Sequence, residues 1–215
     1  MTTRYDDLLE VLRSRRSVRR FMPEPLPAEA MMQLLDAARW APSAGNRQSW
    51  RVLAVTNRTL FDRMGEAVSA RTAEVRGDLH PAAARVAGAY LDAFTHFTGA
   101  PLVLVFIHRG GPDMLRAVRR SRIEGHDTAL ASLDPEASAL ASAAAAIQNL
   151  LLAAHVLGLG ACWMTGPLLA ADELSLLLEV PQGWRLTALI PVGRPAETPE
   201  PPPRRPIDRL VRAIE

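Results

Sequence analysis

The pattern of apolar and polar positions predicts a chain in which helices and strands interleave. Apolar residues at helical spacing predict four helices, at residues 5–15, 25–41, roughly 135–157 and 170–180. Continuous apolar runs predict buried strands at residues 50–56, 101–108 and 185–193, and a short strand is expected at 161–166. Residues 58–98 are expected to be helical with a break near 76–81. This order predicts an α+β fold.

Polar and glycine-rich stretches separate these elements. Pro42 to Ser49 should end the second helix, and the GLG at 158–160 should end the helix before it, with glycine in a left-handed cap. The proline-rich tail predicts an extended C-terminal arm at 195–215, long enough to wrap around a neighbouring chain. We find no repeat and no linker, so residues 1–215 are expected to form one domain. Residues 65–98 and 109–132 are its expected variable or lid regions.

Composition narrows the classes of function. The 25 basic residues are all arginine, and 23 acidic residues leave a net charge of only +2. A near-neutral total argues against a dedicated nucleic-acid binder, although the basic runs leave that reading as a remote alternative. Guanidinium groups are well suited to forked binding of phosphate or carboxylate. The charge pattern therefore favours recognition of a small anion.

Cysteine and histidine usage narrows the chemistry further. Cys162 is the only cysteine, so no intrachain disulfide or cysteine-based metal cluster can form. The charged N-terminus has no apolar core of a signal peptide, and a cytoplasmic location is expected. The five histidines are scattered and are expected at the surface or as hydrogen-bonded core residues, with no metal site. The apolar stretch 137–159 contains Ser142, Gln148 and Asn149, so we interpret it as a buried helix and expect no membrane partner.

Three segments remain polar without a structural reason, and one glycine motif can be set aside. The stretch GLGACWMTG lacks the third glycine of a dinucleotide fingerprint, because Trp163 stands there, and it follows a helix. The three polar segments are RRSVRRF (15–21), APSAGNRQSW (41–50) and PPPRRPIDRL (201–210). Taken singly, each also fits an ordinary role, as a solvated helix end, a turn and a basic tail.

Taken together and in this order, the segments resemble the nitroreductase family of FMN-dependent oxidoreductases. That family opens with R-x-S-x-[RK]-x-F and continues with A-P-S-x-x-N-x-Q-P-W. An Ala/Leu-rich helix with Gln-Asn then precedes G-[LV]-G-x-x-W, G-x-P and a C-terminal R-x-P. The later motifs read AIQNLLLAAHVLGLGACWMTG (146–166), IPVGRP (190–195) and RRP (204–206) here. The resemblance covers residues 8–212, and Ser49 departs from the family's usual proline.

The resemblance implies a fold and an assembly. It implies a mixed, mainly antiparallel sheet flanked by helices, in an intertwined homodimer that pairs through the helix at 135–157 and holds FMN at the subunit interface. It also implies NAD(P)H as electron donor and a small-molecule acceptor. No side chain need act as acid or base, because the flavin supplies the reactivity.

The resemblance also assigns residues to FMN. Arg15, Ser17 and Arg204 would hold the phosphate with Arg16 close by, and Arg19 would face N1 and O2 of the ring, whereas Arg20 is expected on the surface. A second group would lie against the ring, formed by Pro42, Ser43, Ala44 and Asn46 of the partner-crossing loop. The third group would pass N5, formed by Met164, Thr165 and Gly166, with Thr165 as a candidate hydrogen-bond donor.

Two enzymatic readings stay open. The favoured one is ping-pong transfer from NAD(P)H through FMN to a nitroaromatic, quinone or related acceptor. The other is an O₂-using biosynthetic oxidase or dehydrogenase, or a flavin-modifying enzyme similar to a benzimidazole synthase. Arginines at 116–122 could select an acidic substrate for such an enzyme, although a solvated face is the more ordinary interpretation of that run.

Overall fold

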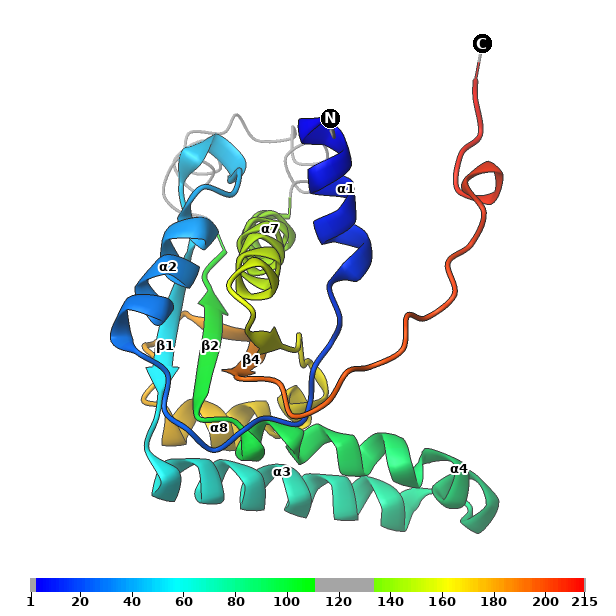
Figure 1. Cartoon of the computed structure of the whole chain (residues 1–215). Helices are drawn as coiled ribbons and strands as arrows, with labels where there is room; N and C mark the ends of the chain where they lie inside the picture. The colour runs from blue at the N-terminus through cyan, green and yellow to red at the C-terminus, as the bar shows by residue number, and fades with distance from the viewer. Residues whose placement is uncertain (1–2, 111–133, 215) are drawn as a thin grey trace, which may run out of the picture.

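A four-stranded antiparallel sheet forms the centre of the computed structural model, which describes residues 3–110 and 134–214 (Figure 1). The strand order is β1-β2-β4-β3. The bounds are β1 (Trp50–Val55), β2 (Leu102–His108), β3 (Gly160–Ala161) and β4 (Arg185–Gly193). Three predicted strands are thus confirmed. Most of the predicted lid at 109–132 lies outside the described residues.

The strand predicted at 161–166 is wrong beyond its first residue. Only Gly160–Ala161 pairs continuously with β4, and Met164 forms an isolated bridge with Leu189. The chain then enters the 3₁₀ helix η3 (Gly166–Ala170), with Pro167 in its first turn. Thr165, just before η3, already has helical backbone angles (φ −108°, ψ −18°), so the extended conformation ends before Gly166.

Helices cover both faces of the sheet. On one face lie α2 (Ala28–Arg39) and α7 (Pro135–Val156); on the other lie α3 (Arg58–Asp78), η2 (Ala93–Gly99) and α8 (Ala171–Leu177) (Figure 1). Every residue of β2 is buried, and its side chains alternate between the two cores. A strand buried on both faces reads as a continuous apolar run, which is why β2 was predictable.

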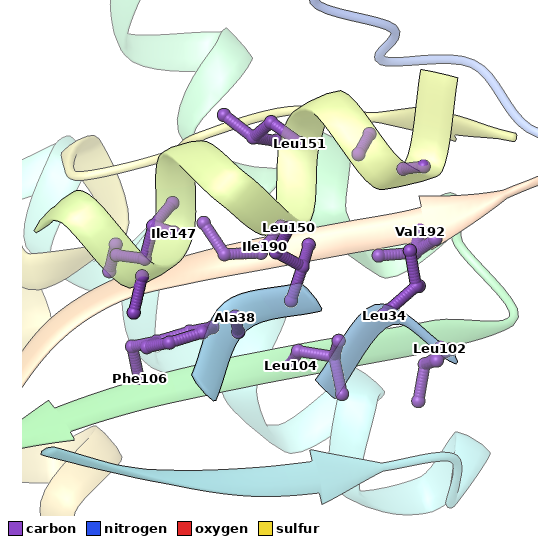
Figure 2. Packing of buried hydrophobic residues seen from close by; sticks show 14 of the residues in the cluster. Leu34, Ala38, Leu102, Leu104, Phe106, Ile147, Leu150, Leu151, Ile190 and Val192 are labelled. Carbon is purple, nitrogen blue, oxygen red and sulfur yellow. The ribbon is translucent and has the colours of Figure 1, made fainter. Parts of the chain in front are cut away.

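The core between α2, α7 and the sheet joins segments far apart in sequence. Figure 2 shows Leu34 of α2 and Leu150 of α7 beside Leu104 of β2 and Ile190 of β4. All four side chains are fully buried. Burying one such side chain stabilises a fold by about 1.5–3 kcal/mol. The helix predicted at 25–41 is confirmed as α2, and Leu34 and Ala38 form its buried face.

The long helix α7 is a core helix with defined ends. Asp134 accepts hydrogen bonds from the N–H groups of Glu136 and Ala137 at its start. At its end Gly158 has φ of 71°, the left-handed cap predicted from the sequence. By length and composition alone α7 could span a membrane, but 44% of its apolar window is buried inside the protein. Its buried face is therefore part of the protein core.

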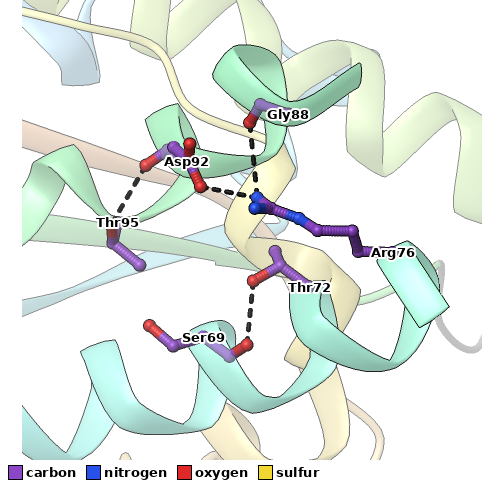
Figure 3. Close-up of polar contacts among 6 residues, drawn as sticks. All are labelled: Ser69, Thr72, Arg76, Gly88, Asp92 and Thr95. Atoms are coloured by element: carbon purple, nitrogen blue, oxygen red, sulfur yellow. Dashed lines mark hydrogen bonds and ion pairs between the residues drawn. The ribbon is translucent and has the colours of Figure 1, made fainter. Parts of the chain in front are cut away.

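Residues 58–98 form a helical region broken where the sequence predicted. The long helix α3 is followed by α4 (Pro81–Asp92), which begins after His80, and then by η2. Figure 3 shows the contact that ties them together, in which Arg76 donates to the Asp92 carboxylate at 2.6 Å and to the Gly88 carbonyl at 3.4 Å. Whether this region covers a substrate stays a prediction.

One predicted core histidine is present at the end of β2. The two ring nitrogens of His108 lie 2.8 Å from the Thr187 hydroxyl and 3.1 Å from Glu136 Oε1. Burial lowers the pKa of His108, and Glu136 opposes that shift. The ring therefore has partners on both sides, as expected of a hydrogen-bonded core histidine.

The two ends of the chain carry little of the core. Helix α1 (Arg4–Ser14) begins with a capping box between Thr3 and Asp6 and buries no residue. At the other end, residues 200–214 are exposed and leave the body of the protein as an extended arm, with one 3₁₀ turn, η4 (Ile207–Arg209) (Figure 1).

Candidate active site

The arginine segment, residues 15–21, lies as an extended strip between β3 and residues 194–197. The Val18 N–H donates to the Ala161 carbonyl at 3.0 Å, and Ser17 forms a parallel bridge with Ala161. On the other side the Ala196 N–H donates to the Arg20 carbonyl at 2.9 Å. Backbone pairing on both sides therefore fixes a segment whose own charges repel one another.

Two glycines allow the segment to lie this close. A Cβ on Gly160 would stand 2.7 Å from Cγ1 of Val18, and one on Gly193 would stand 3.0 Å from Cδ1 of Phe21. Both distances are too short for an added carbon unless a neighbour moves. Gly160, the second glycine of the GLG stretch, thus allows close packing against Val18. This packing role was not predicted from the sequence.

Alternation along the strip separates its inner and outer side chains. Val18 is buried, so Ser17 and Arg19 point to the opposite side. Arg15 is half-buried, and burial lowers the pKa of its guanidinium. The positive charges of Arg204 and Arg16 lower it further. Arg204, near the other end of the chain, therefore lies within electrostatic reach of Arg15, and Ser17 follows Arg15 two residues later in the same strip.

No carboxylate neutralises this cluster among the residues described. The ion pairs found within residues 3–110 and 134–214 include none to Arg15, Arg16 or Arg204. Guanidinium groups that converge near a hydroxyl match the needs of a dianionic phosphate. The residues present therefore fit the phosphate end of FMN.

Arg16 and Arg20 have further roles. The Arg16 guanidinium donates to the carbonyls of Arg13 at 2.6 Å and Arg15 at 2.9 Å, where it satisfies the C-terminal end of α1. Arg20 is 82% exposed, as predicted, and its Nε lies 3.8 Å from the Glu197 carboxylate. Arg16 can thus approach a phosphate only with its remaining N–H groups.

The loop at 42–48 has a tight fold of its own. It contains the 3₁₀ turn η1 (Ala44–Asn46), with φ of 59° at Gly45 and 51° at Asn46. The Ser43 hydroxyl accepts from the Gln48 N–H at 3.1 Å, and the Ala44 N–H donates to the Ser142 hydroxyl of α7 at 3.3 Å. Pro42, Ala44 and Asn46 are exposed, so the loop presents them outward.

The arginine segment and this loop lie far apart in one chain. The loop is attached to α7 at Ser142, whereas the Ser14 hydroxyl, next to the arginine segment, lies 2.7 Å from Nε2 of His155. Thirteen residues of α7 separate these two points, about 20 Å at 1.5 Å per residue. One chain therefore does not bring the two predicted parts of the FMN site together.

The segment predicted to pass N5 lies at the end of the sheet. Met164 is buried, and its backbone exchanges hydrogen bonds of 3.0 and 2.9 Å with Leu189. Thr165 is exposed and precedes η3, and a Cβ on Gly166 would overlap the ring of Phe94. Tight packing on either side holds Thr165 in place, but its contact with a flavin stays a prediction.

Two residues of the site region were missed by the sequence analysis. Glu197 Oε1 accepts hydrogen bonds from the backbone N–H groups of Arg19 at 2.6 Å and Arg20 at 3.1 Å. Burial raises the pKa of the Cys162 thiol behind the segment, while Arg19 and Arg15 oppose that shift. Glu197 stands outside the quoted motifs, and Cys162 stands at an unspecified position of the G-[LV]-G-x-x-W motif, so neither contact could be predicted before the distant segments pair.

Cavities elsewhere do not coincide with this cluster. One cavity of about 690 Å³ is apolar and is lined by the 23–28 loop, Met31 and Arg58. Another, of about 520 Å³, lies between α3 and α4 and includes Arg76 and Asp92. Neither of these two cavities is lined by a predicted FMN-binding residue.

Comparison with known proteins places the chain in a family. Residues 12–194 match the family described as the Nitroreductase family. The chain belongs to the nitroreductase family. A 5,6-dimethylbenzimidazole synthase of Rhodobacter capsulatus is 31% identical over 202 residues, covering 93% of this chain and 89% of that protein.

Solved structures share the fold of this nitroreductase-family chain. A BluB-like flavoprotein from Clostridium difficile 630 matches with a TM-score of 0.83 at 23% identity, covering 97% of this chain and 99% of that one. A nitroreductase with bound FMN from Desulfitobacterium hafniense matches with a TM-score of 0.72 at 24% identity over the full length of both chains. The predicted α+β, nitroreductase-like fold is thus confirmed.

Replacing Gly160 tests the close packing of the arginine segment. We expect Gly160→Ala to lower the free energy of unfolding by about 1–3 kcal/mol, because the added methyl group meets Val18. Gly88→Ala is the control. It lies in α4 with open space around its Cβ and should stabilise by up to about 1 kcal/mol. Urea unfolding measures both, and equal stability of the two variants would contradict the packing.

Proposed function

We propose that this nitroreductase-family chain is an FMN-dependent oxidoreductase that works as a homodimer. The observation that carries the proposal is that the half-buried Arg15 lies within electrostatic reach of Arg16 and Arg204, and that no ion pair neutralises any of the three among the residues described. Arg15 and Arg204 would bind the FMN phosphate through their guanidinium forks, and Ser17 would donate its hydroxyl. Arg16 would add positive charge while it caps α1.

Arg19 would serve the other end of the flavin. In the proposed complex its guanidinium faces N1 and O2, where two-electron reduction places negative charge, and a fixed cation stabilises that charge. When bound, FMN supplies the redox chemistry, in which NAD(P)H delivers two electrons, leaves, and is replaced by a nitroaromatic, quinone or related acceptor. Thr165 would donate a hydrogen bond near N5 from its side chain or backbone.

The homodimer is supported by two observations on the single chain. The loop at 42–48 lies about 20 Å along α7 from the arginine segment, so only a partner's loop could cover the same flavin. The C-terminal arm and the outer face of α1 also expose large apolar side chains, including Leu8, Ile207, Leu210 and Val211. Apolar surface of this kind marks an interface, and a stiff arm loses little entropy on docking. Leu140 and Val156 are also exposed on α7, the helix predicted to pair.

A second reaction stays within the same site. The 31% identity to a 5,6-dimethylbenzimidazole synthase favours an enzyme that uses O₂, or that acts on the flavin itself. The residues that bind FMN would be shared by the two reactions, so they do not separate them. The two reactions differ in their electron donor and in their natural acceptor, and these can be measured.

Reduction kinetics decide between the two reactions. If purified protein carries flavin, its yellow spectrum also removes the nucleic-acid alternative. We expect anaerobic stopped-flow mixing with NADH or NADPH to bleach the flavin in one fast phase, and nitroaromatic or quinone to restore it. Slow bleaching by both nucleotides, with rapid consumption of supplied reduced FMN by O₂, would favour the synthase reaction instead.

Arg204 provides a test of the phosphate site. Arg204→Ala should weaken FMN binding by roughly ten- to a hundredfold, because a charge-assisted contact contributes about 1.5–3 kcal/mol. Arg20→Ala is the matched control, since Arg20 is exposed beside Glu197. Titration of flavin-free protein with FMN gives both dissociation constants, and equal values would refute the assignment.

Arg19 provides a test of the ring end. Arg19→Gln removes the charge and retains much of the length, so reduced FMN should lose more binding energy than oxidised FMN. The midpoint potential should then fall by roughly 30 mV, which corresponds to about 1.4 kcal/mol for a two-electron couple. A phosphate ligand would instead weaken both redox states alike. Spectroelectrochemical titration beside the wild type distinguishes the two, and an unchanged potential would exclude the N1 role.

A further inference from the structure

The Glu197 carboxylate accepts hydrogen bonds from backbone N–H groups of the arginine segment that do not pair with a neighbouring backbone carbonyl. Along the segment, the N–H groups of Val18 and Met22 donate to backbone carbonyls on the two neighbouring strands. The backbone N–H groups of Arg19 and Arg20 both donate to Glu197 Oε1, at 2.6 and 3.1 Å. Hydrogen bonds to an ionised acceptor are roughly twice as strong as neutral ones.

This contact fixes the backbone where Arg19 leaves it. In a regular extended strand successive N–H groups point to opposite sides, so two that reach one oxygen require a bend at this place. The bend lies between the bridges at Ser17 and Phe21. The Glu197 side chain is only 26% exposed, which keeps water from competing for the same two donors.

Glu197 and Arg19 both lie close enough to the buried Cys162 thiol to affect it. Arg19 lowers and Glu197 raises the pKa of the buried Cys162 thiol, so both charges lie within electrostatic reach of that sulfur. The Arg19 guanidinium also donates to the Ser17 carbonyl at 3.4 Å, so its side chain is held against the backbone of the same segment. The direction of Arg19 therefore depends on the backbone that Glu197 holds.

We propose that Glu197 is a positioning residue for the flavin, whose carboxylate clamps the Arg19–Arg20 backbone and so directs the Arg19 guanidinium at the N1 and O2 edge of FMN. This inference rests on the proposed function. The clamp joins the arm that carries Arg204 to the segment that carries Arg15 and Ser17. It thereby links the two ends of the flavin site within one chain.

A clamp and a bare charge have opposite effects on the flavin potential. A nearby carboxylate opposes the negative charge of reduced flavin, so losing the charge alone raises the midpoint potential. Losing the clamp lets Arg19 swing away, and the potential falls as it does in Arg19→Gln. Glu197→Gln retains an acceptor oxygen without the charge, whereas Glu197→Ala removes both and Glu197→Asp keeps the charge on a shorter side chain.

The experiment compares these three variants with wild type, with Glu200→Ala as the control on the same arm. In Glu197→Ala and Glu197→Asp we expect the ratio of reduced to oxidised FMN affinity to fall about tenfold, a drop of roughly 30 mV. Glu197→Gln and Glu200→Ala should stay at or above the wild-type potential. The double variant Arg19→Gln/Glu197→Ala should have a potential no lower than that of Arg19→Gln alone, because the guanidinium that Glu197 would position is already absent.

Hydrogen exchange in the flavin-free protein provides a readout that does not depend on FMN. The amides of Arg19 and Arg20 should exchange faster in Glu197→Ala and stay protected in Glu197→Gln. The proposal is overturned if Ala and Gln raise the potential equally, or if Glu197→Ala weakens both redox states alike. If wild-type protein fails to bind FMN, the proposed function and the flavin role of Glu197 are both wrong. Protection of the Arg19 and Arg20 amides in that protein would still demonstrate the contact with Glu197.

Discussion

Positive charge concentrated at a half-buried place is the constraint on which the rest of the site depends. Arg15 is partly removed from water and lies within electrostatic reach of Arg204 and Arg16, and both burial and the neighbouring positive charges disfavour its charged form. In the proposed complex the FMN phosphate would offset this cost. The close packing of Gly160 on Val18 and of Gly193 on Phe21 holds the segment rigidly enough for the cluster to persist.

The same constraint explains why a single chain looks incomplete. The loop that should cover a flavin is attached to the far part of α7, and the arm bearing Arg204 leaves the body of the protein (Figure 1). In the proposed dimer both features have one cause, because each site draws its floor from one chain and its cover from the other. The hydrophobic core of the single chain does not need the partner subunit, since α7 buries eight residues within its own subunit.

The sequence predicted those elements whose pattern is local. The buried strand β2, the stripe of Leu34 and Ala38, and the glycine cap at Gly158 were all predictable, because burial on two faces, helical spacing and a left-handed residue leave local signs. Ordered motifs predicted the family. The end of β3, the packing role of Gly160 and the contact of Glu197 were not predictable, because each depends on which distant segment lies alongside.

Hybrid dimers test the shared flavin site most directly. One parent carries Arg15→Ala with Ser17→Ala, which removes the phosphate ligands; the other carries Ala44→Trp, which fills the place of the ring. Neither parent should retain FMN. If each site combines two chains, a randomly reassociated mixture has half hybrids, and each hybrid has one undamaged site, so about a quarter of all sites should bind FMN. A mixture that binds no more FMN than its parents would contradict a site built from two subunits.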